Sequence, residues 1–502
     1  MKNKIATLEN LKILRKKNLN KKIVLAHGTF DFFHYGHLEH LEKSKDLGDL
    51  LVVSITADKY IKKGVGRPIY KQDQRLKFIS SLDFVDYVVA INSTSGIEII
   101  NCLKPDIYSK GHEYKNKNND FTRKILAEEK EVKKNKGKIS YTNEMVLSSS
   151  NLINRMKFTE KGLDEEFRES FKKSNDFSYF FKKFNEIQNK NILVIGDSII
   201  DEYVFTTALA KSPKEEIISV KEEKKNVYFG GIFATANNIS NFVNNVTLLT
   251  LIGNEKGLEK KIKKRLNKNL NYYFCTNENT KTTTKTRYLD NSNKKLFQTN
   301  KLNFSLIDLK TEKKILKFLK KNIKNFDLVV ANDFGHGLLT PKIIKVLESQ
   351  SKKLCINVQT NSANFGFNFF DKYKKCYYLS LDEPEVRYAL KDRDNNIKIL
   401  VKKMLKKTKA QIIAVTYGAN GTKMFSNNKI VSLPAFSKNV VDTLGAGDAF
   451  FAISSIYSMC DNNSKNIGFV GNLAGAMKIQ FLGHERNIER DDLIGYMKSF
   501  LA

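Results

Sequence analysis

The chain has 502 residues, which is too long for one ordinary domain and suits two or three. With 41% hydrophobic and 28% charged residues it has a globular composition, which excludes a disordered or a membrane-embedded chain. No apolar run approaches the roughly 20 residues that cross a bilayer, and the polar N-terminus is unlike a signal peptide. The five cysteines are scattered without a C-x-x-C pair, so we expect a cytoplasmic protein without a membrane partner.

The net charge of +32 raises the question of nucleic-acid binding. Only 12 of the 86 basic residues are arginine, however, and the lysines are mixed with asparagine and isoleucine in a chain without tryptophan. Nucleic-acid surfaces favour clustered arginine with interleaved aromatic residues. We therefore expect no nucleic-acid partner and interpret the lysine runs as solvated surfaces.

Short apolar runs alternate with amphipathic stretches over the first 155 residues. Strands are predicted at residues 22–28, 49–56, 86–91 and 106–111, and helices at 37–48, 71–82 and 96–104. This alternation indicates a parallel α/β sheet, on which ligands gather at the carboxyl ends of the strands.

Residues 156–190 break this alternation, with no proline, one glycine and phenylalanines at helical intervals. We interpret them as a helical connector that packs in part on the second domain. A strand within residues 191–205 then opens a second, larger α/β series. The predicted organisation is a domain over residues 1–155, a connector over 156–190 and a second domain over 191–502.

The first motif is H-G-T-F-D-F-F-H-Y-G-H, at residues 27–37. A predicted buried strand ends at Gly28, where the chain turns. A predicted helix then begins in the segment that contains His34, Gly36 and His37. Two imidazoles three residues apart at a helix N-terminus share a face beside outward N–H groups, which predicts a phosphate site without a Walker lysine. A metal pair is the alternative, but no third ligand follows at ligand spacing.

These residues resemble the nucleotidyltransferase superfamily that includes cytidylyltransferases and heptose-phosphate adenylyltransferases. The stretches at residues 63–68, 73–75, 85–88 and 110–114 are similar to the middle of that family, and residues 148–151 resemble its phosphate-holding helix start. The resemblance implies a Rossmann-like fold with His34 and His37 as catalytic residues. It implies nucleotide or phosphate contacts for Gly28, Thr29, Phe30, Gly36, Lys63, Arg67, Lys110, Ser148, Ser149 and Ser150.

In that superfamily a phosphorylated substrate attacks the α-phosphate of a nucleoside triphosphate and expels pyrophosphate. Catalysis is positioning plus neutralisation of charge by the two histidines, a lysine and Mg²⁺. The sequence leaves open whether Lys63 or Lys110 reaches the phosphates, and whether the nucleotide is ATP or CTP.

The second motif is D-T-L-G-A-G-D-A-F, at residues 442–450, followed by an apolar helical stretch. Gly445, Ala446 and Gly447 offer successive backbone N–H groups to a developing phosphate anion. Asp448 at that turn can accept a proton from an attacking hydroxyl. A glycine-rich helix cap is the alternative explanation, and the motif does not extend to a dinucleotide G-x-G-x-x-G pattern.

As a unit this motif resembles the ribokinase-like (PfkB) sugar kinases, and the resemblance runs from residue 191 to the C-terminus. It implies an α/β fold with a small β lid, a possible homodimer through that lid, and ATP with Mg²⁺ as cofactors. Asp448 would be the base, and Gly445, Ala446 and Gly447 the anion hole. ATP contacts are implied for Thr416, Gly418 and Gly421, sugar contacts for Asp197, Asp201, Gly230, Gly231, Asn238 and Asp333, and a place in the Mg²⁺ region for Glu385.

Three positions depart from the related kinases. Ala234 stands where the heptose kinases have the asparagine of G-G-x-x-N, and His336 where they have the lysine of D-Y-G-K-G. Asp382, with Glu385, replaces the asparagine of N-x-x-E. The first two concern the substrate and the third the Mg²⁺ region, and none concerns Asp448.

A kinase joined to a nucleotidyltransferase resembles the bifunctional enzymes of ADP-heptose synthesis, with the domain order reversed. The implied reactions are phosphorylation of a sugar phosphate by ATP, on D-glycero-D-manno-heptose 7-phosphate at C1, and transfer of AMP to the 1-phosphate. A cytidylyltransferase–kinase for another sugar or polyol phosphate is one alternative. A regulatory or binding protein with one inactive domain is another.

Overall fold

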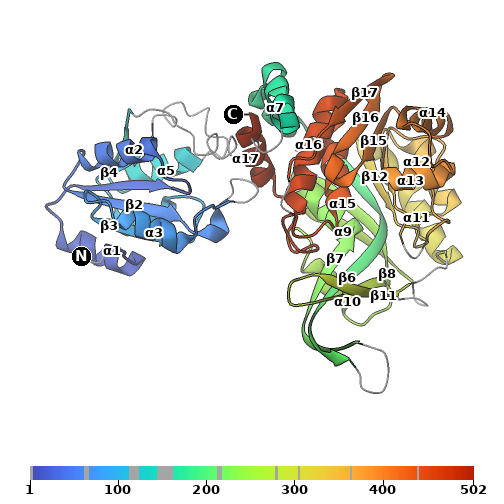
Figure 1. The fold of residues 1–502 in the computed structure, drawn as a ribbon, viewed down its shortest axis with the longest axis horizontal. Coiled ribbons are helices and arrows are strands. Elements are labelled where there is room, and N and C mark those ends of the chain that lie inside the picture. The colour runs from blue at the N-terminus through green and yellow to red at the C-terminus, as the bar shows by residue number, and fades with distance from the viewer. Residues whose placement is uncertain are drawn as a thin grey trace. The chain divides into compact units, whose positions relative to one another are not determined.

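The computed structural model describes residues 4–61, 67–111, 124–143, 162–211, 218–277, 281–302, 306–361, 364–437 and 440–501. The chain divides into two compact units, one of residues 1–165 with 494–502 and one of residues 166–493. Both are α/β units with parallel sheets, which confirms the predicted fold class (Figure 1). Within the described residues no helix is long and apolar enough to cross a membrane.

The first unit is a five-stranded parallel sheet in the order β3-β2-β1-β4-β5. The chain moves outward from β1 in one direction and then returns to its other side, so the order reverses between β1 and β4. Such a point is where parallel α/β sheets form their ligand crevice. The strands are β1 (Ile23–Gly28), β2 (Leu50–Thr56), β3 (Tyr87–Ile91), β4 (Ile107–Lys110) and β5 (Lys138–Tyr141).

Both faces of this sheet are covered, because successive residues of β1 belong to different cores. Ile23 and Leu25 pack in one cluster, Val24 and Ala26 in another, and all four are fully buried. This explains why the strand reads as a continuous apolar run. The helices are α1 (Leu8–Lys17), α2 (Tyr35–Lys45), α3 (Gln72–Ser80), α4 (Ile97–Leu103) and α5 (Lys124–Lys134); α1 and α5 were not predicted from the sequence.

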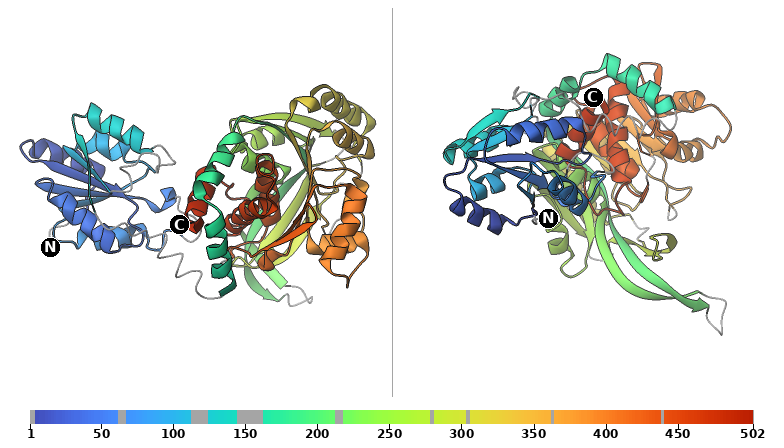
Figure 2. Two further views of the ribbon diagram at one scale, coloured as in Figure 1. Left: turned by 90° about the horizontal axis from the view of Figure 1, so that it is seen from above. Right: turned by 60° about the vertical axis from the view of Figure 1, so that its left-hand side comes forward.

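The second unit is built around one very long strand, β6 (Asn191–Lys211). Its first half lies between β8 and β12 in a parallel sheet, and its second half lies between β7 and β10 in a lid. Figure 2 shows the β6–β7 ribbon twisting away from the main sheet. The other strands are β7 (Ile218–Gly231), β8 (Asn245–Gly253), β9 (Leu270–Asn277), β10 (Thr283–Leu289), β11 (Lys295–Lys301), β12 (Leu328–Asp333), β13 (Leu354–Val358), β14 (Tyr378–Asp382), β15 (Ile412–Thr416), β16 (Thr422–Ser426) and β17 (Lys429–Leu433).

Helices lie on both faces of the main sheet of this unit (Figure 1). Helix α15 is buried along almost its whole length, from Asp448 to Tyr457, because it packs between α9 and α16. The helices are α9 (Ile232–Ser240), α10 (Leu258–Lys263), α11 (Leu309–Asn322), α12 (Pro341–Gln350), α13 (Glu383–Leu390), α14 (Ile397–Thr408), α15 (Ala446–Tyr457) and α16 (Ser464–Lys478). Helix α17 (Arg490–Leu501) spans the division of the chain between residues 493 and 494.

Two helices occupy the described part of the connector, α7 (Gly162–Ser174) and α8 (Phe177–Glu186). Phe180 is fully buried, with its ring centroid 5.3 Å from that of Phe469 and 5.9 Å from that of Tyr457. These contacts make α8 part of the core of the second unit.

We expect Phe180→Ala to lower the free energy of unfolding of the second unit by about 3–5 kcal/mol, because it leaves a cavity in an aromatic core. Urea unfolding followed by the activity of this unit measures the loss. Lys182→Ala, at an exposed position of the same helix, is the matched control. Equal stability of both variants would show that α8 is not part of the core.

Candidate active sites

The paired histidines lie where β1 gives way to α2. His34 directly precedes the first turn of α2 in extended backbone, and His37 is within that turn. Their rings stack, with centroids 3.9 Å apart and planes at 17°. Gly36 is buried between them, at a helix end where backbone N–H groups point outward. The arrangement suits a phosphate-bearing ligand at the point where the strand order reverses.

The turn that leaves β1 is held in a fixed shape. Phe30 is buried with a φ of 47°, and a Cβ on Gly28 would lie 2.9 Å from its ring. Arg75 of α3 is buried and donates at 2.7 Å to the carbonyl oxygen of Thr29 and at 2.9 Å to that of Thr56. The loops after β1 and β2 are therefore joined by one guanidinium group.

A second buried guanidinium group lies on the same turn. Arg67 donates through Nε to the carboxylate of Asp31, which also accepts from the backbone N–H of Ile69 at 2.5 Å. Nη2 of Arg67 is buried and has no hydrogen-bond partner among the described residues. A buried guanidinium N–H donor without a protein acceptor is suited to bind an anionic ligand.

The Lys110 ammonium at the end of β4 forms a buried ion pair with Glu128, at 3.1 Å. Glu128 also accepts from the Tyr108 hydroxyl at 2.9 Å and from the Gly96 N–H at 2.6 Å. Burial by itself raises the pKa of Glu128, but Lys110, His27 and these hydrogen bonds outweigh it and bring the pKa down to about 2. The ammonium is thus fixed by a permanently ionised carboxylate beside β1.

Four predicted phosphate ligands, Lys63, Ser148, Ser149 and Ser150, lie outside the described residues. Of the two lysines that the sequence leaves open, the structure therefore places only Lys110.

In the second unit Asp448 lies in the first turn of α15, with 7% of its surface exposed. Its Oδ1 accepts from Gln359 Nε2 at 2.6 Å and lies 3.5 Å from Asn332 Nδ2. Burial raises the pKa of Asp448 to about 6, with Gln359 opposing and Asp201 adding to the shift. The carboxylate is therefore oriented and more basic than an exposed aspartate, as a proton acceptor requires.

Gly445, Ala446 and Gly447 form the N-terminal end of α15. Gly445 has a φ of 76°, and a Cβ there would lie 2.8 Å from the ring of His484, so the position requires glycine. A Cβ on Gly447 would meet nothing within 4 Å, so there is space beside the helix end. This is a backbone cradle of the kind that binds phosphate.

Asp442 ties this cradle to the lid. Its carboxylate accepts from the Leu444 N–H at 3.1 Å, from the Tyr203 hydroxyl of β6 at 2.9 Å and from the Lys295 ammonium of β11 at 2.6 Å. The loop that forms the cradle is therefore positioned by lid strands.

Three buried aspartates gather where β6 passes from the main sheet into the lid and where β12 ends. Asp197 accepts from the backbone N–H groups of Phe334, His336 and Leu338, at 3.0, 3.1 and 3.2 Å. Burial and the nearby Asp333 raise the pKa of Asp197 to about 6. The two remaining carboxylates are paired with cations, Asp333 with Lys372 at 2.6 Å and Asp201 with Arg287 at 2.6 Å.

The predicted glycine pair ends β7 against these aspartates. A Cβ on Gly230 would lie 1.9 Å from Oδ2 of Asp201, so only glycine permits the approach. Gly231 precedes α9 with a φ of 55°. Asn238, in contrast, uses its side-chain oxygen to accept from the Ile488 N–H at 2.8 Å, which is a contact of the fold.

The predicted nucleotide residues follow β15, apart from this cluster along the sheet. Thr416 donates to Asp382 at 3.2 Å, and the short turn Gly418–Asn420 leads to Gly421. Glu385 accepts from the Asp382 and Thr360 N–H groups at 2.8 and 2.9 Å, and burial raises its pKa to about 7.

The sequence pattern of the pfkB family carbohydrate kinases matches residues 189–489. The chain belongs to this family of carbohydrate kinases. A second pattern, described as cytidylyltransferase-like, matches residues 25–155. The unit that contains β6 is therefore the kinase domain, and the unit that contains β1 is the nucleotidyltransferase-like domain.

Curated relatives match the N-terminal part of the chain. The bifunctional protein HldE of Campylobacter jejuni is 44% identical over 116 residues, which cover 23% of this chain and 25% of the relative. HldE of Aliarcobacter butzleri is 38% identical over 162 residues, 31% of this chain and 32% of the relative. The chain thus aligns with only a quarter to a third of these relatives.

Among solved structures, a phosphofructokinase-2 mutant from Escherichia coli aligns with a TM-score of 0.50 and 12% identity. The alignment covers 62% of this chain and 99% of that chain. At this identity the likeness concerns the fold of the kinase domain alone.

The structure adds site residues that the sequence analysis missed. Gln359 follows the buried strand β13 directly, a position at the carboxyl end of a parallel strand that could have marked it. Lys285 and Arg287 alternate along β10 opposite β6, and the lid was not divided into strands beforehand. Lys478, the last residue of α16, and His484, which follows that helix, both approach Gly445 from far along the chain. They carried no sequence signal.

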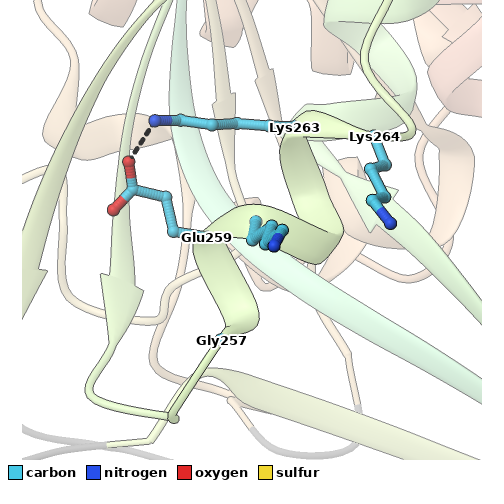
Figure 3. Close-up of a pocket in the computed structure, with 5 residues that line it drawn as sticks. Gly257, Glu259, Lys263 and Lys264 are labelled. Carbon is cyan, nitrogen blue, oxygen red and sulfur yellow. Dashed lines mark ion pairs between the residues drawn. The ribbon is translucent and has the colours of Figure 1, made fainter.

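A surface hollow lies elsewhere, beside the short helix α10 (Figure 3). Gly257 and the side chains of Glu259, Lys260, Lys263 and Lys264 line it, and Lys263 pairs with Glu259 at 2.5 Å. None of the candidate catalytic residues lines this hollow.

The described residues contain no group of three histidine, cysteine or acidic side chains that could enclose a metal ion. Glu385 already accepts from two backbone N–H groups. The carboxyl of Glu385 lies within electrostatic reach of Asp448. Asp448 and Glu385 are therefore the carboxylates that could contribute to a Mg²⁺ site, since Mg²⁺ keeps several waters and needs only one or two carboxylates.

We expect kcat of the kinase reaction to fall below pH 6, by about tenfold per pH unit, because Asp448 must be ionised to accept a proton. Measuring kcat at saturating sugar phosphate and ATP separates this effect from titration of the free substrate. Because Asp197 titrates in the same range, the midpoint belongs to both carboxyls. A constant kcat down to pH 5 would contradict the role of Asp448.

Proposed function

We propose that the chain is a bifunctional sugar-activating enzyme. The kinase domain transfers the γ-phosphoryl group of ATP to C1 of a sugar phosphate, D-glycero-D-manno-heptose 7-phosphate. The nucleotidyltransferase-like domain then transfers AMP from ATP to the sugar 1-phosphate and releases pyrophosphate. The observation that carries the proposal is the oriented, buried Asp448 at a glycine cradle, in a chain that also has the stacked His34–His37 pair.

In the kinase reaction Asp448 accepts the proton of the attacking hydroxyl while Gln359 and Asn332 keep its carboxylate in place. The N–H groups of Gly445, Ala446 and Gly447 stabilise the negative charge that develops on the transferred phosphoryl group. Asp197, Asp201 and Asp333 accept hydrogen bonds from sugar hydroxyls. Mg²⁺ bound to ATP neutralises phosphate charge when present.

In the nucleotidyl transfer the substrate phosphate is the nucleophile, so no protein group need become covalent. His34, His37 and the N-terminus of α2 bind the triphosphate and stabilise the charge at the α-phosphate. Arg67 supplies a further donor through its buried Nη2. Lys110 is held at the end of β4 by its ion pair with Glu128, and its ammonium group donates N–H hydrogen bonds to phosphate oxygens.

One assay tests the proposal. The purified chain is given a panel of sugar phosphates with ATP or CTP, and ADP and pyrophosphate are measured separately. We expect ADP with heptose 7-phosphate and ATP, and pyrophosphate with heptose 1-phosphate and ATP. If neither ADP nor pyrophosphate forms with any pair of sugar phosphate and nucleotide, the proposed function is disproved.

Two observations favour keeping a second candidate, a cytidylyltransferase–kinase for another sugar or polyol phosphate. Ala234 and His336 both differ from the heptose kinases, and both are buried in the kinase domain. Release of pyrophosphate from CTP would identify this alternative. Formation of ADP with another sugar phosphate, but not with heptose 7-phosphate, would identify it too.

The lid supports the proposal of a homodimer. Every residue of β11, an edge strand of the lid, is exposed, and Leu296 and Phe297 on it are 46% and 52% exposed. A long exposed edge strand is a natural surface for pairing with another copy. The molar mass in solution tests this assignment.

A further inference from the structure

An ammonium group is buried in the kinase domain without a contact partner. Lys285 lies on β10 opposite Asp201 of β6, and only 9% of its surface is exposed. Two residues along the strand, Arg287 pairs with Asp201, whereas the Lys285 ammonium forms no hydrogen bond or ion pair with any described residue. Burial lowers the pKa of Lys285, and Asp201 opposes that shift. The ammonium group is therefore on a largely buried side chain and is not neutralised by a contact with a described residue.

A buried imidazole lies within electrostatic reach of this ammonium. The backbone N–H of His336 donates to Asp197 at 3.1 Å, and its side chain is 7% exposed. Its Nε2 is buried with no hydrogen-bond partner among the described residues. Burial, reinforced by Lys285, lowers the pKa of His336 to about 4, so the ring is neutral at pH 7.

Lys285 and the strand end that leads to His336 lie near the candidate base. Asn332 is four residues before His336, and its Nδ2 lies 3.5 Å from Oδ1 of Asp448. The buried Oδ1 of Asn332 is also without a partner in the described structure. Lys285 interacts electrostatically with Asp448. Buried polar groups are normally satisfied, and one left alone is destabilising. An ammonium and an imidazole N–H together match the acceptor oxygens of a phosphoryl group.

We propose that Lys285 and His336 form a phosphoryl-binding subsite beside Asp448. The proposal rests on the proposed kinase function and specifies its substrate contacts. The phosphoryl group is either the one that the sugar already carries or the γ-phosphoryl of ATP, since both present the same oxygens. His336, where the related kinases have lysine, leaves this subsite with one fixed positive charge instead of two.

Binding to the full-length protein tests the subsite and identifies the source. Lys285→Met and His336→Leu are titrated calorimetrically with heptose 7-phosphate, with the unphosphorylated heptose and with a non-hydrolysable ATP analogue. If the sugar supplies the group, affinity for heptose 7-phosphate falls by about 10- to 100-fold and affinity for heptose is unchanged. If ATP supplies it, affinity for the analogue and kcat fall instead. Unchanged affinities and kcat in both variants would overturn the proposal.

Control variants separate binding from folding. Lys285→Arg retains the charge and is expected to retain most of the affinity, and Lys301→Met removes an exposed charge from the neighbouring strand β11 without effect. Inorganic phosphate is a probe that needs no turnover. It should protect the wild type against thermal unfolding more than it protects Lys285→Met, and equal protection of the two would count against the subsite. This result would hold even if no sugar phosphate in the panel yields ADP, which would disprove the proposed function alone.

Discussion

Replacing Asp448 by asparagine is expected to lower kcat for ADP formation by about 10²- to 10⁴-fold, the usual loss when a general base is removed. The amide keeps the shape of the side chain and can still accept the hydrogen bond from Gln359, but it cannot take the proton of the attacking hydroxyl. Affinity for ATP should change little. Steady-state kinetics of ADP release, with ATP binding measured by titration, provide both numbers.

The same substitution should stabilise the kinase domain at pH 7. Folding raises the pKa of Asp448 from 3.8 to about 6, so the folded state holds the proton more tightly and loses stability as the pH rises between these values. Ionised Asp448 therefore costs about 3 kcal/mol above pH 6, and asparagine removes that cost. A variant with wild-type kcat would show that Asp448 is not the base, whatever its stability.

Replacing His34 or His37 by alanine is expected to slow pyrophosphate release by about 10²- to 10³-fold, because the charge at the α-phosphate loses a preorganised donor. The stacked rings lie at the first turn of α2, so each truncation also exposes the other ring to water. Single-turnover assays with sugar 1-phosphate and ATP measure the loss.

The kinase reaction of the same variants is the internal control, since ADP formation should proceed at the wild-type rate. His34→Gln, which keeps an N–H donor, should recover part of the activity. Near-normal nucleotidyl transfer in both alanine variants would remove the assignment of this site.

Local patterns in the sequence were enough to predict much of the first domain. The run Ile23–Ala26 is apolar because both of its faces are buried, and a short-range signal of this kind can be read without the fold. The motif around Asp448 was likewise predictable because its glycines, base and helix start are contiguous. Helix α1 was missed because only Leu11 is buried in it, so its pattern is weak.

Contacts between distant segments could not be predicted in this way. Gln359 reaches Asp448 across 89 positions of the chain, and Asp442 is held by Lys295 across 147 positions. The Lys110–Glu128 pair likewise depends on how α5 packs against β4. Such pairs are fixed by tertiary packing, and no local periodicity encodes them.

Because β6 is one continuous strand, it fixes the distance between two aspartates of the kinase domain. Asp197 lies in the half of this strand that belongs to the main sheet, and Asp201 in the half that pairs with the lid. Four residues of extended chain set their backbones about 13 Å apart with side chains on one face. A one-residue insertion between them would turn one carboxylate to the opposite face, whereas an insertion beyond Phe205 would leave the interval unchanged. The distance between the two aspartates is thus set by the covalent geometry of the strand, and changes in the surrounding loops leave it unchanged.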